Sequence, residues 1–131
     1  SNPNGYTTNR SIHQLIDGGY FLKTGGLKLE TLRAKVRPAR MLGATPNQLF
    51  AQIMEYLQES HRELEPLYRF EKEGKFSGEA GKGLEGRAFL EDQLLKAGQM
   101  LGSIWYSAWQ QAPEDRYLKQ KLLERKAGDS R

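Results

Sequence analysis

Residues 84–112 read LEGRAFLEDQLLKAGQMLGSIWYSAWQQA, and this stretch decides the fold. Placed at 100° per residue, its apolar side chains cover a wide arc and leave only a narrow polar strip. The strip contains Lys96, Gln99, Ser103 and Ser107. A helix that is apolar over most of its circumference is typical of the centre of a helical protein. We therefore predict an all-α fold, an irregular helical bundle around a central apolar helix at about 84–112, with Trp105 and its aromatic neighbours in the core.

A second long helix is predicted to begin at Thr45. Thr45 can accept a hydrogen bond as the N-cap, Pro46 fits the first helical position, and Gln48 can complete a capping box. Pro66 has no backbone N–H and clashes with the preceding turn, so it should kink or divide the helix near Arg62–Glu63. One face is predicted to carry the apolar residues Leu49, Phe50, Ile53, Leu57, Leu64, Leu67 and Tyr68.

The flanking segments are also predicted to be helical. Residues 7–9 offer N-cap oxygens for a helix at about 10–20, which Gly18-Gly19 or Gly25-Gly26 would end. Residues 27–44 predict a short helix or an irregular connection. Pro113 opens a final amphipathic helix. We treat residues 1–131 as one helical domain.

Composition restricts the chemistry. The chain has no cysteine, which excludes disulfides and thiolate metal sites. No apolar run approaches the ~20 residues of a membrane span, so we expect none.

The net charge of +4 is concentrated near the N-terminus, where Lys28, Arg33, Lys35, Arg37 and Arg40 form a basic cluster. This cluster is either a solvated surface segment or a phosphate-binding one, and Arg33, Lys35, Arg37 and Arg40 are the candidate contacts to a substrate phosphate.

One candidate metal-binding pair is His13 with Asp17. A spacing of four places both side chains on one face of the first predicted helix. An imidazole nitrogen and a carboxylate oxygen can bind one zinc ion, although two ligands do not complete a tetrahedral site. An ordinary pair on the helix surface has the same spacing, and both interpretations remain open.

Two further pairs favour structural roles. His61 with Glu65 is explained by a partly buried histidine that hydrogen-bonds to a neighbour. Arg87 and Glu91 point into the apolar arc of the long helix, which favours an architectural salt bridge over a catalytic pair.

The run Arg10-Ser11-Ile12-His13-Gln14-Leu15-Ile16-Asp17 resembles a motif of the zinc-dependent phospholipase C and single-strand-specific nuclease superfamily. In that family an Asn-Leu-His-x-x-Trp-Asp pattern provides a histidine and an aspartate to zinc from one helix. His13 and Asp17 match these ligands, whereas Ile12 replaces the Leu, Ile16 stands at the Trp, and Arg10-Ser11 departs from the usual preceding residue. The stretch 96–109 looks like the closing helix of bacterial members.

The resemblance implies an all-helical, three-zinc phosphodiesterase that cleaves a nucleic acid or another phosphodiester. Most of the family's ligands precede this motif, so the chain would be the C-terminal segment of a larger hydrolase, inactive alone, with the N-terminal part of the same enzyme as its partner. Members of the family are generally secreted or periplasmic.

Two alternatives remain. One is a non-enzymatic helical interaction domain whose basic segment at 28–40 binds an acidic partner or nucleic acid. The other is a purely structural helical domain.

Overall fold

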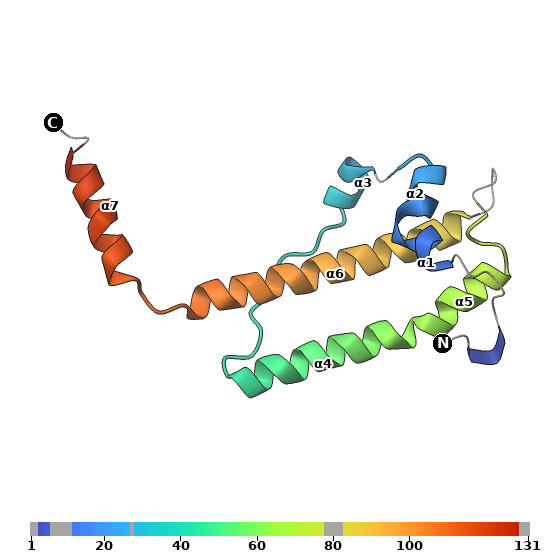
Figure 1. Cartoon of the computed structure of the whole chain (residues 1–131), viewed down its shortest axis with the longest axis horizontal. Coiled ribbons are helices and arrows are strands. Elements are labelled where there is room, and N and C mark those ends of the chain that lie inside the picture. Colours follow the sequence, from blue (N-terminus) through green and yellow to red (C-terminus); the bar gives the residue numbers. More distant parts are fainter. Residues whose placement is uncertain (1–2, 6–11, 27, 78–82, 129–131) are drawn as a thin grey trace.

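The computed structural model describes residues 3–5, 12–26, 28–77 and 83–128. Every regular element in these residues is a helix, which confirms the predicted all-α fold. Two long helices, α4 (Pro46–Arg62) and α6 (Leu84–Gln111), run antiparallel as a hairpin (Figure 1). The other elements are η1 (Pro3–Gly5), α1 (Ile12–Gln14), η2 (Leu15–Gly19), α2 (Tyr20–Lys23), α3 (Leu29–Arg33), α5 (Leu64–Lys72) and α7 (Arg116–Gly128).

The start and the break of α4 follow the local sequence signals. The Gln48 backbone N–H donates to Thr45 Oγ1 over 3.3 Å, and the Thr45 N–H donates to Gln48 Oε1 over 3.2 Å. This is the predicted capping box, with Pro46 in the first turn. The helix ends at Arg62, and α5 begins two residues later. The missing N–H of Pro66 therefore divides the helix where predicted.

The N-terminal helical segment is continuous through α1, η2 and α2. η2 is a π-turn in which the Tyr20 N–H donates to the Leu15 carbonyl. Gly19 therefore lies inside the segment, and the chain leaves it at Thr24. Gly25 and Gly26 follow with φ of +88° and +76°, a backbone region that glycine adopts without a steric penalty. The predicted capping residues 7–9 lie outside the described residues.

An aromatic core of Tyr20, Phe21, Phe76 and Leu90 packs where α2, α6 and the chain after α5 meet. Tyr20 is 1% exposed, lies edge-on to Phe76 at 5.4 Å between ring centroids, and donates its hydroxyl to the Gly83 carbonyl. A Cβ atom at Gly86 would clash with the Lys75 carbonyl oxygen and the Phe76 ring, so only glycine fits there. The core therefore depends on α6 approaching the backbone at 75–76 closely.

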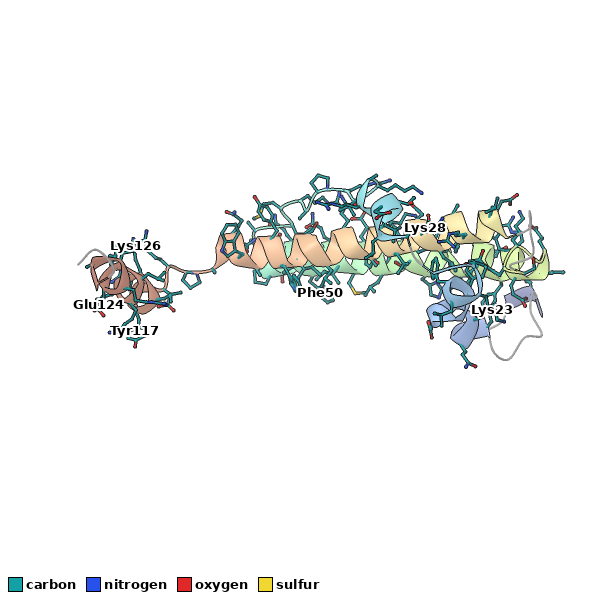
Figure 2. The ribbon with its side chains drawn as sticks, turned by 90° about the horizontal axis from the view of Figure 1, so that it is seen from above. Lys23, Lys28, Phe50, Tyr117, Glu124 and Lys126 are labelled. Atoms are coloured by element: carbon teal, nitrogen blue, oxygen red, sulfur yellow. The ribbon has the colours of Figure 1, made fainter. Side chains whose placement is uncertain are left out.

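The rest of the hairpin is covered on one side only. α3 and the connection at 34–44 lie on one side of α6, whereas α1 and α2 cover only one end of the other side (Figure 2). Exposed apolar side chains fill the remainder of that second side, which we call the apolar face. Its members are Phe50, Met54 and Leu57 of α4 and Leu94, Leu101 and Trp105 of α6.

The extent of the long helix is confirmed, but the expectation that its aromatic residues lie in the core is wrong. Trp105 is 69% exposed and Trp109 is 72% exposed. The physical reason is that no element of the described chain packs over the side of α6 that carries these two rings. None of the described helices is both long and apolar enough to cross a lipid bilayer.

Candidate functional site

The predicted zinc ligands lie on the short N-terminal segment. His13 is in α1 and Asp17 is in η2, and both side chains are exposed. Neither is engaged by a hydrogen bond or ion pair within the described part of the chain. Among those same residues, no three His, Asp or Glu side chains are grouped so that they could hold a metal ion. A zinc site that uses this pair must therefore take further ligands from elsewhere.

The second histidine is placed differently from its prediction. His61 is exposed near the end of α4, and the chain bends at Glu63 before Glu65 in α5. The expectation of a partly buried histidine is therefore wrong. His61 lies in the last turn of α4, next to Arg62.

Arg87 and Glu91 form the architectural salt bridge that the sequence favoured. Arg87 Nε lies 3.0 Å from Glu91 Oε1, and the remaining guanidinium nitrogens donate to Thr24 and to the Gly26 carbonyl. The second oxygen of Glu91 accepts from Lys35 Nζ at 3.3 Å. Because every donor group has a partner, this network closes the turn after α2 against α6 and leaves no group free for chemistry.

Two buried serines attach the connection at 34–44 to α6. Ser107 Oγ accepts from the Leu42 N–H at 2.8 Å and donates to the Ser103 carbonyl at 2.7 Å. Ser103 makes the equivalent pair of bonds with the Arg40 N–H and the Gln99 carbonyl. These hydroxyls accept hydrogen bonds from backbone N–H groups of the connection, which has no regular secondary structure to provide acceptors. The polar strip of α6 is therefore the surface along which the connection runs.

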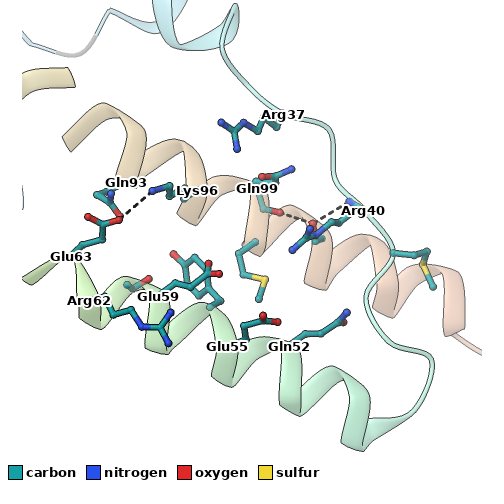
Figure 3. Close-up of a pocket in the computed structure, with 15 residues that line it drawn as sticks. Arg37, Arg40, Gln52, Glu55, Glu59, Arg62, Glu63, Gln93, Lys96 and Gln99 are labelled. Carbon is teal, nitrogen blue, oxygen red and sulfur yellow. Dashed lines mark hydrogen bonds and ion pairs between the residues drawn. The ribbon is translucent and has the colours of Figure 1, made fainter. Parts of the chain in front are cut away.

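The connection, α4 and α6 enclose an open cleft of about 780 Å³ (Figure 3). Arg37 and Arg40 project into it from the connection, and carboxylates project into it from α4 (Figure 3). The charged lining residues are Arg37, Arg40, Glu55, Glu59, Arg62, Glu63 and Lys96.

Only part of the charge in this cleft is neutralised internally. Lys96 Nζ lies 2.8 Å from Asp92 and 3.5 Å from Glu63. The hydrogen bond that Lys96 donates to Asp92 raises the pKa of Lys96 above its usual value, and the negative charges of Asp92 and Glu63 add to the effect. Arg37 and Arg40 have no carboxylate partner among the described residues. The cleft therefore has Arg37 and Arg40 on the connection and, apart from Arg62, acidic side chains on α4.

A second, apolar groove of about 740 Å³ lies on the opposite side of α6, beside α2. Phe21, Tyr56, Leu90 and Leu94 contribute to its walls, and Asp17 is the one acidic residue among the described residues that line it. It opens onto the apolar face through Leu94.

The structure does not bring the predicted metal ligands and basic residues together. Arg33, Arg37 and Arg40 are exposed on the side of α3 and the connection, whereas α1 and η2 lie on the other side of α6 (Figure 2). Lys35 is committed to Glu91. The pair and the basic cluster are therefore two separate surfaces.

Sequence reasoning missed the acidic wall of the cleft and the anchoring role of Ser103 and Ser107. The sequence does contain a signal for the anchoring role of the serines, because Gln99, Ser103 and Ser107 follow one another at intervals of four residues in an otherwise apolar helix. A line of hydroxyl and amide groups on a buried helix predicts a backbone partner. Glu55 and Glu59 read as ordinary solvated positions, and only the fold places them opposite the arginines.

No known protein family matches the chain, and no curated protein and no solved structure matches it either.

Proposed function

We propose that this chain is the C-terminal segment of a zinc-dependent phosphodiesterase, to which it contributes His13 and Asp17 as metal ligands. The observation that carries the proposal is that both side chains of this pair are available to bind a metal ion. Both side chains are exposed, and neither has a partner in the described residues. A spacing of four keeps them on one side of the helical segment. The resemblance of residues 10–17 to the family's metal-binding motif supports the same assignment.

Each residue has a defined part in this function. His13 offers an imidazole nitrogen and Asp17 a carboxylate oxygen, the donor types that zinc accepts from proteins. Zinc, when bound, supplies Lewis acidity toward a phosphate. Since two ligands leave the site incomplete, the remaining ligands come from the N-terminal part of the same enzyme, and the chain is inactive alone. The basic residues take no part in this proposal, because they lie on the other side of α6.

Zinc titration followed by NMR of the imidazole protons tests the pair. The chain contains only two histidines, so each signal can be assigned by one substitution. We expect zinc to shift the His13 signal and the affinity to fall at least about tenfold in Asp17→Asn, because one of two ligands is lost.

His61→Ala is the matched control for this titration, and it should bind zinc as the unchanged chain does. Zinc that shifts only the His61 signal, or that binds Asp17→Asn equally well, contradicts the proposal. In the enzyme that includes the N-terminal part, His13→Ala should abolish phosphodiester hydrolysis.

A second candidate function is binding of an acidic partner through the segment at 28–40. It is favoured by the exposure of Arg33, Arg37 and Arg40, which have no carboxylate partner among the described residues. Such binding falls steeply with salt and does not require a metal.

A fluorescent single-stranded oligonucleotide tests the second candidate. Binding should survive a chelator, and the double substitution Arg37→Ala/Arg40→Ala should weaken it and lower its salt dependence. Lys35→Ala is the control, because Lys35 is already paired with Glu91. Binding that the double substitution leaves unchanged would remove this candidate.

A further inference from the structure

We propose that the chain forms a two-fold symmetric dimer in which the apolar face of one copy packs against the apolar face of a second. The inference is independent of the zinc proposal, because it rests on side chains of α4 and α6 that take no part in the His13–Asp17 pair.

The first argument is the composition of the exposed surface. Residues 97–113 contain no charged side chain, yet Leu101 and Trp105 within this stretch are 50% and 69% exposed. Phe50, Met54 and Leu57 of α4 are exposed as well. Large apolar patches are rare on soluble monomers, and where they occur they mark interaction sites.

The spacing along α6 is that of a helix that packs against another helix. Leu94, Gly98, Leu101, Trp105 and Ala108 follow one another at intervals of four, three, four and three residues. All five are exposed. A 4-3 repeat keeps one narrow seam in line along a helix and is the pattern of helix pairs. The seam therefore indicates a helical partner for α6.

Gly98 supports the same conclusion. Glycine destabilises the interior of a helix relative to alanine, so its presence needs a reason. At Gly102 a Cβ atom would make an ordinary van der Waals contact, 3.7 Å from Ala39 Cβ in the connection. A Cβ atom at Gly98 would meet nothing within 4 Å. Since none of the residues that the structure describes requires a small residue at this position, Gly98 fits the close approach of another helix.

The seam is complementary to itself when two copies of α6 run antiparallel. If the symmetry axis passes between residues 101 and 102, the large Trp105 lies over the second copy's Gly98, and the reciprocal contact is identical. In the same register Leu94 lies level with the second copy's Trp109, beside the apolar groove. A two-fold interface requires this reciprocity, because one surface must fit its own copy.

The apolar residues of α4 indicate the same position for the symmetry axis along the hairpin. Phe50 and Leu57 are symmetric about residues 53–54, so the same operation places each near the other in the second copy. Gln52 of α4 lines the polar cleft together with Met100 and Ser103 of α6, so position 52 of α4 lies across the cleft from positions 100–103 of α6. One axis that lies in the plane of the interface, perpendicular to the long direction of both helices, therefore pairs α4 with α4 and α6 with α6 and gives a four-helix core.

The whole chain exposes more surface than a compact monomer of its mass, which leaves area available for a partner. The chain of 14.9 kDa has an accessible surface of 10322 Å², whereas a compact monomer of this mass has about 7,000 Å². A standard protein interface removes only about 800 Å² from each partner.

Sedimentation equilibrium and intrinsic fluorescence on a dilution series of the whole chain test the proposal. We expect a mass of twice 14.9 kDa, and a red shift of tryptophan emission as the dimer dissociates. The emission reports directly on the interface, because Trp105 and Trp109 are the two tryptophans of the chain.

Gly98→Leu should raise the dimer dissociation constant at least about tenfold, since the added side chain occupies the place of the second copy's Trp105. It should leave the circular dichroism spectrum of the helices unchanged, because the monomer has open space at Gly98. Leu84→Glu is the matched control: Leu84 is 70% exposed on the same helix but lies outside the face, so dimerisation should be unaffected.

Three results would overturn the dimer. One is a monomeric mass for the unchanged chain up to a concentration of about 100 µM, well above the micromolar range of ordinary specific association. The second is undiminished dimerisation of Gly98→Leu. The third is a monomer with blue-shifted, concentration-independent emission, which would mean that α7 of the same chain folds back over the seam.

Discussion

The aromatic core and the apolar face are built from the same kinds of residue, yet their exposures are opposite. Phe76 in the core is 6% exposed, whereas Phe50 on the apolar face is 65% exposed. The difference does not come from helix periodicity, because α6 contributes Leu90 to the first region and Leu101 to the second. It comes from a third element: α2 and the chain after α5 cover one end of the hairpin, and none of the described elements covers the other. Amphipathic pattern alone therefore does not decide burial.

The largest expected effect comes from shortening one phenylalanine in each region. Phe76→Ala should lower the free energy of unfolding by about 3–5 kcal/mol, because it opens a cavity against Tyr20 and Phe70. Phe50→Ala should cost less than about 1 kcal/mol under monomeric conditions, because most of that ring is already in water. Urea unfolding at low protein concentration measures both, and equal losses would mean that the two regions are equally buried.

A loss of intermediate size is expected where the connection covers the polar side of α6. Ser107→Ala should destabilise the chain by about 1–3 kcal/mol, because it leaves the buried Leu42 N–H without its acceptor. Hydrogen exchange at Leu42 should accelerate in the variant. Gln110→Ala, an exposed neighbour on the same helix, serves as the control and should change neither quantity. Unchanged protection at Leu42 would argue that the connection is held by other contacts.

The smallest effect is a dependence on alkaline pH. Burial raises the pKa of Tyr20 above its ordinary value of 10.0, although the positive charge of Arg87 opposes the shift. The folded state therefore favours the neutral phenol more strongly than the unfolded state does. This stabilisation is fully present below pH 10 and is lost as the pH rises through the folded-state pKa.

Chemical unfolding between pH 8 and pH 11 measures this dependence. In Tyr20→Phe, the free energy of unfolding should fall less steeply as the pH rises. Tyr117→Phe, which removes a tyrosine that is 71% exposed, should leave the pH dependence unchanged. If the free energy of unfolding falls just as steeply with pH in Tyr20→Phe, other groups cause the pH dependence.

Local signals in the sequence were sufficient for much of the fold. Thr45 and Gln48 lie within one turn of each other, so their capping box forms from neighbours whatever the rest of the chain does. Pro66 divides α4 from α5 for an equally local reason, the missing N–H. The π-turn at η2 was not foreseen, because nothing in Leu15–Gly19 distinguishes it from an ordinary helical turn.

The candidate sites were predictable only in part. The spacing of His13 and Asp17 placed them on one helical segment, and the structure leaves both exposed. The basic residues were predicted as one cluster, but the fold assigns Lys35 to Glu91 and directs Arg37 and Arg40 into a cleft with Glu55 and Glu59. Contacts across 56 residues, such as that of Lys35 with Glu91, leave no trace in a local pattern.

The sequence by itself determined that the chain is helical, where its long helices begin and end, and which residues lie on one side of each helix. These properties depend on hydrogen bonds and steric contacts within a few residues. The tertiary structure alone decided which apolar stripe is buried, where the polar strip of α6 meets the connection, and that the two candidate binding surfaces lie apart. Those outcomes depend on which elements meet in space, and the free energy of burial is gained only where a second surface arrives.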